Sequence, residues 1–283
     1  MLLTIDVGNT QTVVGLYQQS EPDPTQAGPP SSGADDSALV EHWRLSTDVE
    51  RTGDELAMVL RQLLESAEDG LDRDGLGGDS EEGIELHGIA ISSGVPFVTA
   101  ELRQMCEHRF GLDPVVVGPG VRTGLPIRYD NPGEVGADRV ANAVGALDRY
   151  GAPTVVVDFG TATTFDVISG DGAYLGGAII PGIEVSLDAL FGRAAGLRRV
   201  ELTPPRSVVG RTTVESIQSG VLYGTAAMVD GMVKRIVDEL GATTTIVATG
   251  GLAGVIAPHA ATLTHLDPWI TLHGLRLIWE KNQ

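Results

Sequence analysis

Residues 6–10 read Asp6-Val7-Gly8-Asn9-Thr10, and residues 158–164 read Asp158-Phe159-Gly160-Thr161-Ala162-Thr163-Thr164. Each stretch follows an apolar run that reads as a β-strand, and each has a carboxylate, a glycine two positions later and then hydroxyl side chains. The two aspartates lie 152 residues apart (158 − 6), which is about one domain length. The pattern predicts one phosphate- and metal-handling turn used twice, in two related halves.

The residue types in these turns suit phosphate binding. Glycine lets the backbone reach positive φ and lets N–H groups approach a phosphate, and threonine or asparagine adds donors without bulk. Because Asp6 and Asp158 would repel phosphate oxygens, they need a cation, and hydrated Mg²⁺ is the usual one. A lone Asp-x-Gly is also a common turn at the end of a strand. The repetition of the turn favours a nucleotide site.

Composition and charge narrow the class. The chain has 283 residues, 42% of them hydrophobic, and 37 glycines, which predicts a globular protein of two domains. The single cysteine, Cys106, excludes an internal disulfide and indicates a reducing compartment. We expect a cytoplasmic protein, since the sequence shows neither a secretion signal nor a membrane-spanning stretch. A formal net charge of −19 argues against nucleic-acid binding. The two lysines, Lys234 and Lys281, lie outside glycine-rich loops, which excludes a Walker-type P-loop.

Apolar periodicity predicts the same order of elements, strand, turn, strand and then helices, in both halves. Strands are expected at 2–5, 12–17, 39–45, 88–91, 114–117, 155–157, 165–168, 172–180 and 245–248, and helices at 56–64, 98–110, 137–150, 183–190 and 214–240. This recurrence predicts a duplicated α/β fold with domains at 1–135 and 136–283. Polar, acidic and glycine-rich stretches near 18–38 and 68–83 read as loop insertions.

Two further segments are candidates for the site. A third glycine turn, Thr249-Gly250-Gly251, could lie against the adenine or ribose of a nucleotide, or could simply allow close packing. The loop that starts at Tyr129 leads into a helix whose first turn carries Asp138 and Arg139. Arg139 could bind a substrate carboxylate and Asp138 could accept a proton from a substrate hydroxyl. Alternatively, Asp138 only supports the helix dipole.

These motifs together resemble those of type III pantothenate kinases. The resemblance covers the chain except for the two acidic insertions, and its motifs occur in the family's order: Asp6 to Thr10, Gly136 to Arg139, Asp158 to Thr161, Gly176-Gly177 with Pro181-Gly182, Thr213 to Gly220, Thr249 to Gly251, and Leu272 to Leu275. Gly94 stands where the family commonly has valine, and Gln11 where asparagine is frequent.

The resemblance implies a member of the acetate and sugar kinase, Hsp70 and actin superfamily, with two ribonuclease H-like domains, ATP in the cleft between them, and usually a homodimer. The family phosphorylates pantothenate with ATP to open coenzyme A biosynthesis. Carried over, the residues that bind ATP are Asp6, Val7, Gly8, Asn9, Thr10, Gln11, Thr12, Val13 and Thr161. Asp138 is the general base, Asp158 is the ligand of K⁺ or NH₄⁺, and the residues that bind pantothenate are Tyr129, Gly136, Ala137, Asp138, Arg139 and Thr213.

Two other functions remain open. A kinase for another small hydroxylated molecule would keep the three glycine turns and change the substrate pocket. A non-enzymatic accessory factor in gene regulation is the other alternative, although both phosphate turns and Asp138 favour activity.

Overall fold

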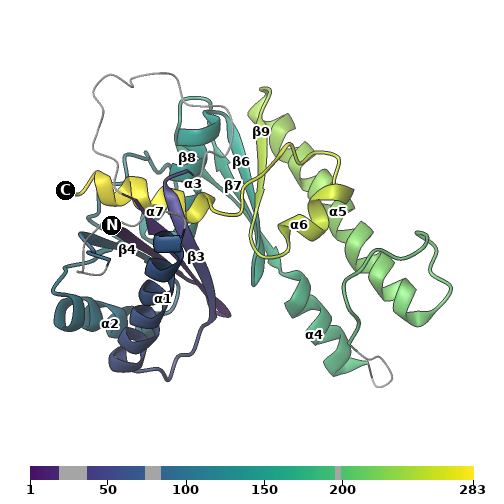
Figure 1. Cartoon of the computed structure of the whole chain (residues 1–283). Coiled ribbons are helices and arrows are strands. Elements are labelled where there is room, and N and C mark those ends of the chain that lie inside the picture. The colour runs from purple at the N-terminus through teal and green to yellow at the C-terminus, as the bar shows by residue number, and fades with distance from the viewer. Residues whose placement is uncertain (19–36, 74–83, 195–198) are drawn as a thin grey trace. The chain divides into compact units, whose positions relative to one another are not determined.

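The structure is a computed structural model that describes residues 1–18, 37–73, 84–194 and 199–283. The chain forms two compact units (Figure 1), which are described separately. Unit 1 consists of residues 1–124, 133–145 and 271–283, and unit 2 consists of residues 125–132 and 146–270. Most of the two acidic insertions, namely residues 19–36 and 74–83, lies outside the described residues.

Unit 1 contains a five-stranded sheet in the order β3-β2-β1-β4-β5. Its strands are β1 (Leu2–Val7), β2 (Gln11–Tyr17), β3 (Leu39–Ser46), β4 (Gly88–Ser93) and β5 (Val115–Val116). The first three strands form an antiparallel meander, whereas β4 pairs in parallel with β1, and β5 in parallel with β4.

Unit 2 repeats this sheet, in the order β10-β9-β6-β7-β8. Its strands are β6 (Thr154–Phe159), β7 (Ala162–Ile168), β8 (Tyr174–Pro181), β9 (Thr245–Thr249) and β10 (His265–Leu266). Again the first three strands pair antiparallel, and the last two add in parallel. Asp6 and Asp158 each occupy the fifth position of a central strand. The duplicated α/β fold predicted from the sequence is therefore confirmed.

Helices cover both faces of the unit 1 sheet. The side chains of Leu3, Ile5 and Val7 point to one face, where they pack with α1 (Gly53–Arg73) and α2 (Pro96–Met105). Alternation along the strand sends Thr4 and Asp6 to the opposite face. That face receives α7 (Ile270–Glu280), because glycines make room for two of its side chains. A Cβ at Gly15 would lie 2.8 Å from Leu272, and one at Gly88 would lie 2.3 Å from the Trp279 ring.

The helix α3 (Ala137–Tyr150) begins in unit 1 and lies against α7 there. A Cβ at Gly274 would lie 1.9 Å from the carbonyl oxygen of Ala141, so the two helix backbones are almost in contact. The hydroxyl of Thr271 also donates to Asn142 Oδ1 at 2.6 Å. These contacts fix the first half of α3 on unit 1.

The unit 2 core lies between the sheet and two helices, α4 (Ile183–Arg193) and α5 (Thr213–Leu240), green in Figure 1. Phe159 and Phe165 pack there against Leu222 and Val229 of α5. A short helix, α6 (Ala253–Ile256), adds to the same core. At the sheet's other face, Arg149 donates to Asp267 at 2.7 Å; their side chains are 5% and 0% exposed.

Two sequence-based expectations differ from the structure. Residues 68–73 were expected in a loop but belong to α1, because Ala67 and Leu71 continue its apolar stripe while Asp69 is exposed. The helix expected at 98–110 ends at Met105 and continues as a π-helical turn, η1 (Cys106–Phe110). The domain boundary expected between residues 135 and 136 stays a prediction; the two compact units place residues 136–145 and 271–283 in unit 1.

No helix within the described ranges is long and apolar enough to cross a membrane.

Candidate active site

The first predicted phosphate turn is a tight hairpin between β1 and β2. The N–H of Gly8 donates to the carbonyl of Gln11 at 2.9 Å, and a Cβ at Gly8 would lie 3.0 Å from that oxygen. The glycine is thus needed for space, since φ of Gly8 is not positive, contrary to the sequence-based expectation. The side chains of Asn9, Thr10 and Gln11 are exposed at the tip of the hairpin. They are the groups of this turn that a phosphate could reach.

Neighbouring strands hold this hairpin in place. The Thr47 hydroxyl, just after β3, donates to the carbonyl of Gly8 at 2.7 Å, and the Thr47 N–H donates to the carbonyl of Thr10 at 3.0 Å. The Ser92 hydroxyl, at the end of β4, donates to the Asp6 carboxylate. Sequence reasoning missed Thr47 and Ser92; their positions at the ends of strands beside the hairpin were the only available signal.

The second turn, between β6 and β7, is a similar tight hairpin, and other parts of the chain pack more closely on it. The N–H of Gly160 donates to the carbonyl of Ala162 at 3.0 Å, and Thr161 is exposed. A Cβ at Gly182 would lie 2.3 Å from the carbonyl oxygen of Thr161, so the residues after β8 pack directly on the turn. Like Gly8, Gly160 does not use positive φ.

The third glycine turn lies beside Asp158. Gly250 adopts φ of 90°, and a Cβ there would lie 2.4 Å from Asp158 Oδ1 and 2.6 Å from the N atom of Phe159. The Asp158 carboxylate therefore occupies space that a side chain at position 250 would fill, so this position requires glycine. Close packing by Gly250, one of the two alternatives inferred from the sequence, is thus observed. Contact of this turn with adenine or ribose stays a prediction.

The first turn of α3 separates the two candidate substrate residues. Asp138 is exposed, whereas Arg139 is buried with 8% of its surface accessible. A Cβ at Gly136 would lie 2.5 Å from Asp138 Oδ1, so the glycine leaves space for this carboxylate. The helix N-terminus beside them favours anions. One side of this turn therefore presents the Asp138 carboxylate to solvent, while the adjacent Arg139 is buried.

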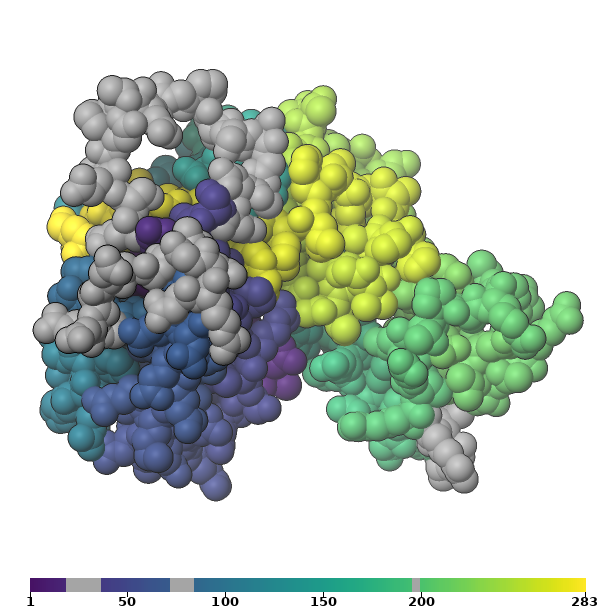
Figure 2. All heavy atoms as spheres, in the orientation of Figure 1, coloured from purple at the N-terminus to yellow at the C-terminus, as the bar shows by residue number. Residues whose placement is uncertain are grey.

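The other candidates belong to unit 2, where Tyr129 is 37% exposed and packs near Tyr174. Thr213 is the exposed first residue of α5. Thr212 caps this helix by accepting the N–H of Glu215 at 3.1 Å. Hydrogen bonds from Arg206 and from the N–H of Arg211 hold the pKa of Glu215 below its ordinary value. The segment before α5 is part of the green surface in Figure 2.

The candidate residues thus form two groups. Unit 1 carries residues 6–13 and 136–139, and unit 2 carries Tyr129, Asp158, Thr161 and Thr213.

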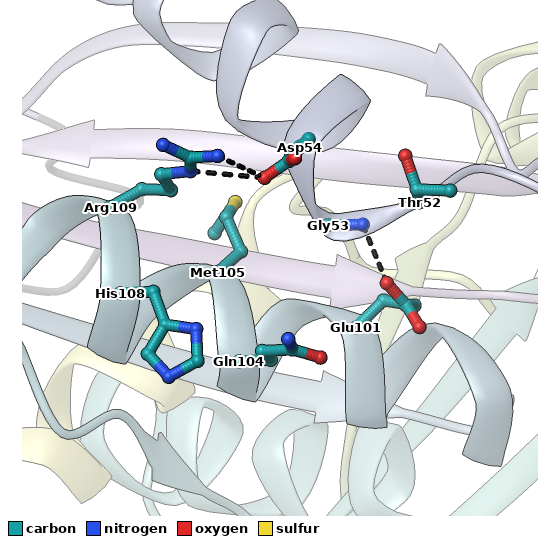
Figure 3. A pocket seen from close by; sticks show the side chains of 8 residues that line it. All are labelled: Thr52, Gly53, Asp54, Glu101, Gln104, Met105, His108 and Arg109. Atoms are coloured by element: carbon teal, nitrogen blue, oxygen red, sulfur yellow. Dashed lines mark hydrogen bonds and ion pairs between the residues drawn. The ribbon is translucent and has the colours of Figure 1, made fainter.

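A pocket of about 160 Å³ on unit 1 contains none of the predicted site residues (Figure 3). It lies where α1 begins, beside α2 and η1. Side chains of α2 and η1 already bind the first turn of α1 there. The N–H of Gly53 donates to Glu101 Oε2 at 2.6 Å, and Arg109 binds Asp54 at 2.6 Å (Figure 3). The neighbouring Cys106 is fully buried, and burial raises the pKa of its thiol to about 12. This pocket is therefore a structural feature of the unit.

Two units with the same strand order, each with an Asp-x-Gly hairpin at the end of its central strand, define the class of this protein by its fold, a duplicated ribonuclease H-like α/β fold. Residues 2–235 match the family model for type III pantothenate kinase. The chain is 50% identical over 286 residues to the type III pantothenate kinase of Streptomyces griseus, covering 100% of this chain and 98% of the relative. It is 45% identical over 282 residues to that of Moorella thermoacetica, covering both chains completely. The chain belongs to the type III pantothenate kinase family.

A solved structure supports the same fold. A Campylobacter jejuni protein assigned to the Baf family of transcriptional activators superposes with a TM-score of 0.56 and 17% identity, covering 99% of this chain and 98% of that one. At this level of identity the likeness concerns the fold alone.

Proposed function

We propose that the protein transfers the γ-phosphoryl group of ATP to the primary hydroxyl of pantothenate, which gives 4′-phosphopantothenate, the first step of coenzyme A biosynthesis. Similarity to relatives of this name over the full length of the chain supports the proposal. The geometric observation that carries it is the exposed Asp138 carboxylate on the first turn of α3, with Gly136 leaving it room.

In this proposal Asp138 accepts the proton of the pantothenate hydroxyl as that oxygen attacks the γ-phosphorus. A base at this position raises the nucleophilicity of the attacking oxygen. Arg139 binds the pantothenate carboxylate, for which a buried guanidinium with its planar set of donors is well suited. Tyr129, Gly136, Ala137 and Thr213 are the other residues proposed to bind pantothenate.

The two hairpins would bind ATP. Among the proposed ATP-binding residues, Asp6 to Val13 and Thr161, the exposed hydroxyl and amide groups are those of Asn9, Thr10, Gln11 and Thr161. The oxygen donors of Asp6, Asn9 and Thr10 suit Mg²⁺, which neutralises phosphate charge when bound. The Asp158 carboxylate, in the space left by Gly250, suits a monovalent cation, K⁺ or NH₄⁺.

A homodimer fits the apolar surface of unit 2. Ile179 of β8 is 64% exposed, Val209 is 77% exposed and Val214 of α5 is 49% exposed. Exposed apolar side chains of this size often belong to contact surfaces between proteins. The cytoplasmic location stays a prediction.

A coupled ADP-release assay tests the activity. ADP should form only when pantothenate is present, and replacing K⁺ by Na⁺ should reduce the rate. Asp138→Asn should fold, bind ATP and lose about 10²–10⁴-fold in kcat. Asp69→Asn, the same change at an exposed position of α1, is the control and should leave kcat unchanged. ADP release that does not depend on pantothenate would reject the proposed substrate, and near-normal turnover of Asp138→Asn would reject the base.

A further inference from the structure

The residues just before Tyr129 are fixed to the edge of the unit 2 sheet. Ile127 forms a parallel bridge with Tyr174, the first residue of β8. The N–H of Tyr174 donates to the carbonyl of Pro126 at 2.8 Å, and the N–H of Arg128 donates to the carbonyl of Tyr174 at 2.8 Å. The Arg128 guanidinium also binds the Asp171 carboxylate. The backbone that leads to Tyr129 is therefore held on both sides of Ile127.

The ring of Tyr129 rests on a bare stretch of β8. Gly176 adopts φ of 116°, and a Cβ there would lie 3.0 Å from Cε2 and 3.1 Å from Cδ2 of the Tyr129 ring. These distances are below ordinary van der Waals contact for carbon atoms, which begins at about 3.5 Å. No side chain larger than hydrogen fits at position 176 while the ring stays where it is.

Tyr174, which lies next to the Tyr129 ring, is held in place by burial and by a hydrogen bond. The Tyr174 ring lies 6.4 Å from the Tyr129 ring, centroid to centroid, at an interplanar angle of 55°. Tyr174 is fully buried, and its hydroxyl donates to Asp166 Oδ1 at 2.9 Å. Asp166 is also fully buried and accepts the Thr164 hydroxyl at 3.2 Å. A side chain added at Gly176 must therefore displace the Tyr129 ring away from β8, because the buried Tyr174 and Asp166 cannot move to make room for it.

We propose that Gly176 is a positioning residue for pantothenate: by lacking a side chain, it lets the Tyr129 ring lie against β8 and so keeps open the space that the substrate occupies. This role rests on the proposed function, in which Tyr129 lines the pantothenate pocket. The Tyr129 ring is 37% exposed, so one part contacts the protein and the rest is available to a ligand. Moving an aromatic contact by a few tenths of an ångström should weaken ligand binding without changing the proton transfer assigned to Asp138.

Gly176→Ala tests the role, and Gly172→Ala is its matched control. Gly172 lies in the turn before β8 with φ of 78°, and a Cβ there would meet only Leu147, at 3.6 Å. Both substitutions place alanine at positive φ, but only the first touches Tyr129. Gly176→Ala should raise KM for pantothenate about tenfold, with kcat and KM for ATP within about twofold of wild type. Gly172→Ala should leave all three values within about twofold of wild type.

A double-mutant cycle separates positioning from backbone strain. In a Tyr129→Ala background the ring is gone, so adding Gly176→Ala should leave KM for pantothenate unchanged. An equal rise in both backgrounds would overturn the positioning role, as would an unchanged KM in Gly176→Ala alone. Should Gly176→Ala not fold, Asp171→Ala removes the exposed anchor of Arg128 and should raise KM for pantothenate with kcat retained; an unchanged KM would again overturn the role. If wild type itself forms no pantothenate-dependent ADP, the proposed function fails, and this role fails with it.

Discussion

The contact between α7 and α3 leads to a quantitative prediction for Gly274→Ala. The added Cβ would lie 1.9 Å from the Ala141 carbonyl oxygen, 2.7 Å from its carbonyl carbon and 3.1 Å from the Gly145 N atom. Ordinary contact between such atoms begins near 3.5 Å, so the helices must separate by about 1.5 Å. Overpacking of this kind costs about 1–3 kcal/mol. Alanine in a helix interior recovers about 0.5–1 kcal/mol relative to glycine. Because a separation of this size belongs to the upper part of the overpacking range, about 2–3 kcal/mol, the net loss for unit 1 is expected to be about 1–2 kcal/mol.

Cys106 provides a local measure of this loss. It is the only cysteine in the sequence, it is fully buried in the core of unit 1, and its raised thiol pKa of about 12 suppresses reaction in the folded state. The Cys106 thiol can therefore be alkylated only when unit 1 opens. If unit 1 closes again faster than alkylation occurs, the labelling rate is proportional to the fraction of molecules in which unit 1 is open. A loss of 1–2 kcal/mol should accelerate labelling of Gly274→Ala about 5–30-fold over wild type.

Gly70→Ala is the control in the same unit. Gly70 is an exposed glycine of α1, and a Cβ there would meet no atom within 4 Å. The same substitution should therefore stabilise unit 1 by about 0.4–1 kcal/mol and slow labelling about two- to fivefold. If Gly274→Ala labels no faster than wild type while Gly70→Ala labels more slowly, the helix contact does not limit the stability of unit 1.

Three further predictions concern unit 2. Arg149→Met leaves the buried Asp267 carboxylate without its cation and should cost about 3–5 kcal/mol in urea unfolding; a loss below about 1 kcal/mol would show that the pair is not effectively buried. Burial raises the pKa of Asp230, but hydrogen bonds from the Thr262 side chain and nearby N–H groups outweigh it and hold the pKa below its ordinary 3.8. This stabilisation is complete above about pH 4 and is lost as the pH falls through the folded pKa, so Asp230→Asn should be less stable at pH 7 and should lose less stability on acidification; parallel acid profiles would contradict this. Asp158→Asn should remove most of the rate advantage of K⁺ over Na⁺ in ADP release, and an unchanged ratio would move the cation to other ligands.

Local patterns predicted much of the fold. The helix bounds expected at 137–150 agree with α3, because its apolar periodicity is interrupted by Gly136 before it and Gly151 after it. Both Asp-x-Gly hairpins were also predictable, since each lies between two apolar strands that are adjacent in the sequence. These features depend on short stretches of chain and are visible in its residue order.

The unpredicted features depend on tertiary contact. Nothing near Gly15 or Gly88 in the sequence indicates that Leu272 and Trp279, almost two hundred residues or more away, lie directly on them. Thr47 and Ser92 reach the first hairpin only because β3 and β4 belong to the same sheet as β1. A helix turns by about 100° per residue, so the side chains of Asp138 and Arg139 point in different directions. Which of the two is buried depends on how α3 packs, and the sequence does not show that.

The discontinuity of unit 1 has a consequence for how the chain is made. Its first strands leave the ribosome early, but the helix that covers one face of their sheet is formed by residues 271–283. Until those residues emerge, the surfaces around Gly15 and Gly88 have no cover, whereas the 146–270 segment of unit 2 is already complete. The usual expectation that the N-terminal part is completed first therefore fails here, and a chain truncated after residue 270 should contain a folded second unit and an unfinished first one.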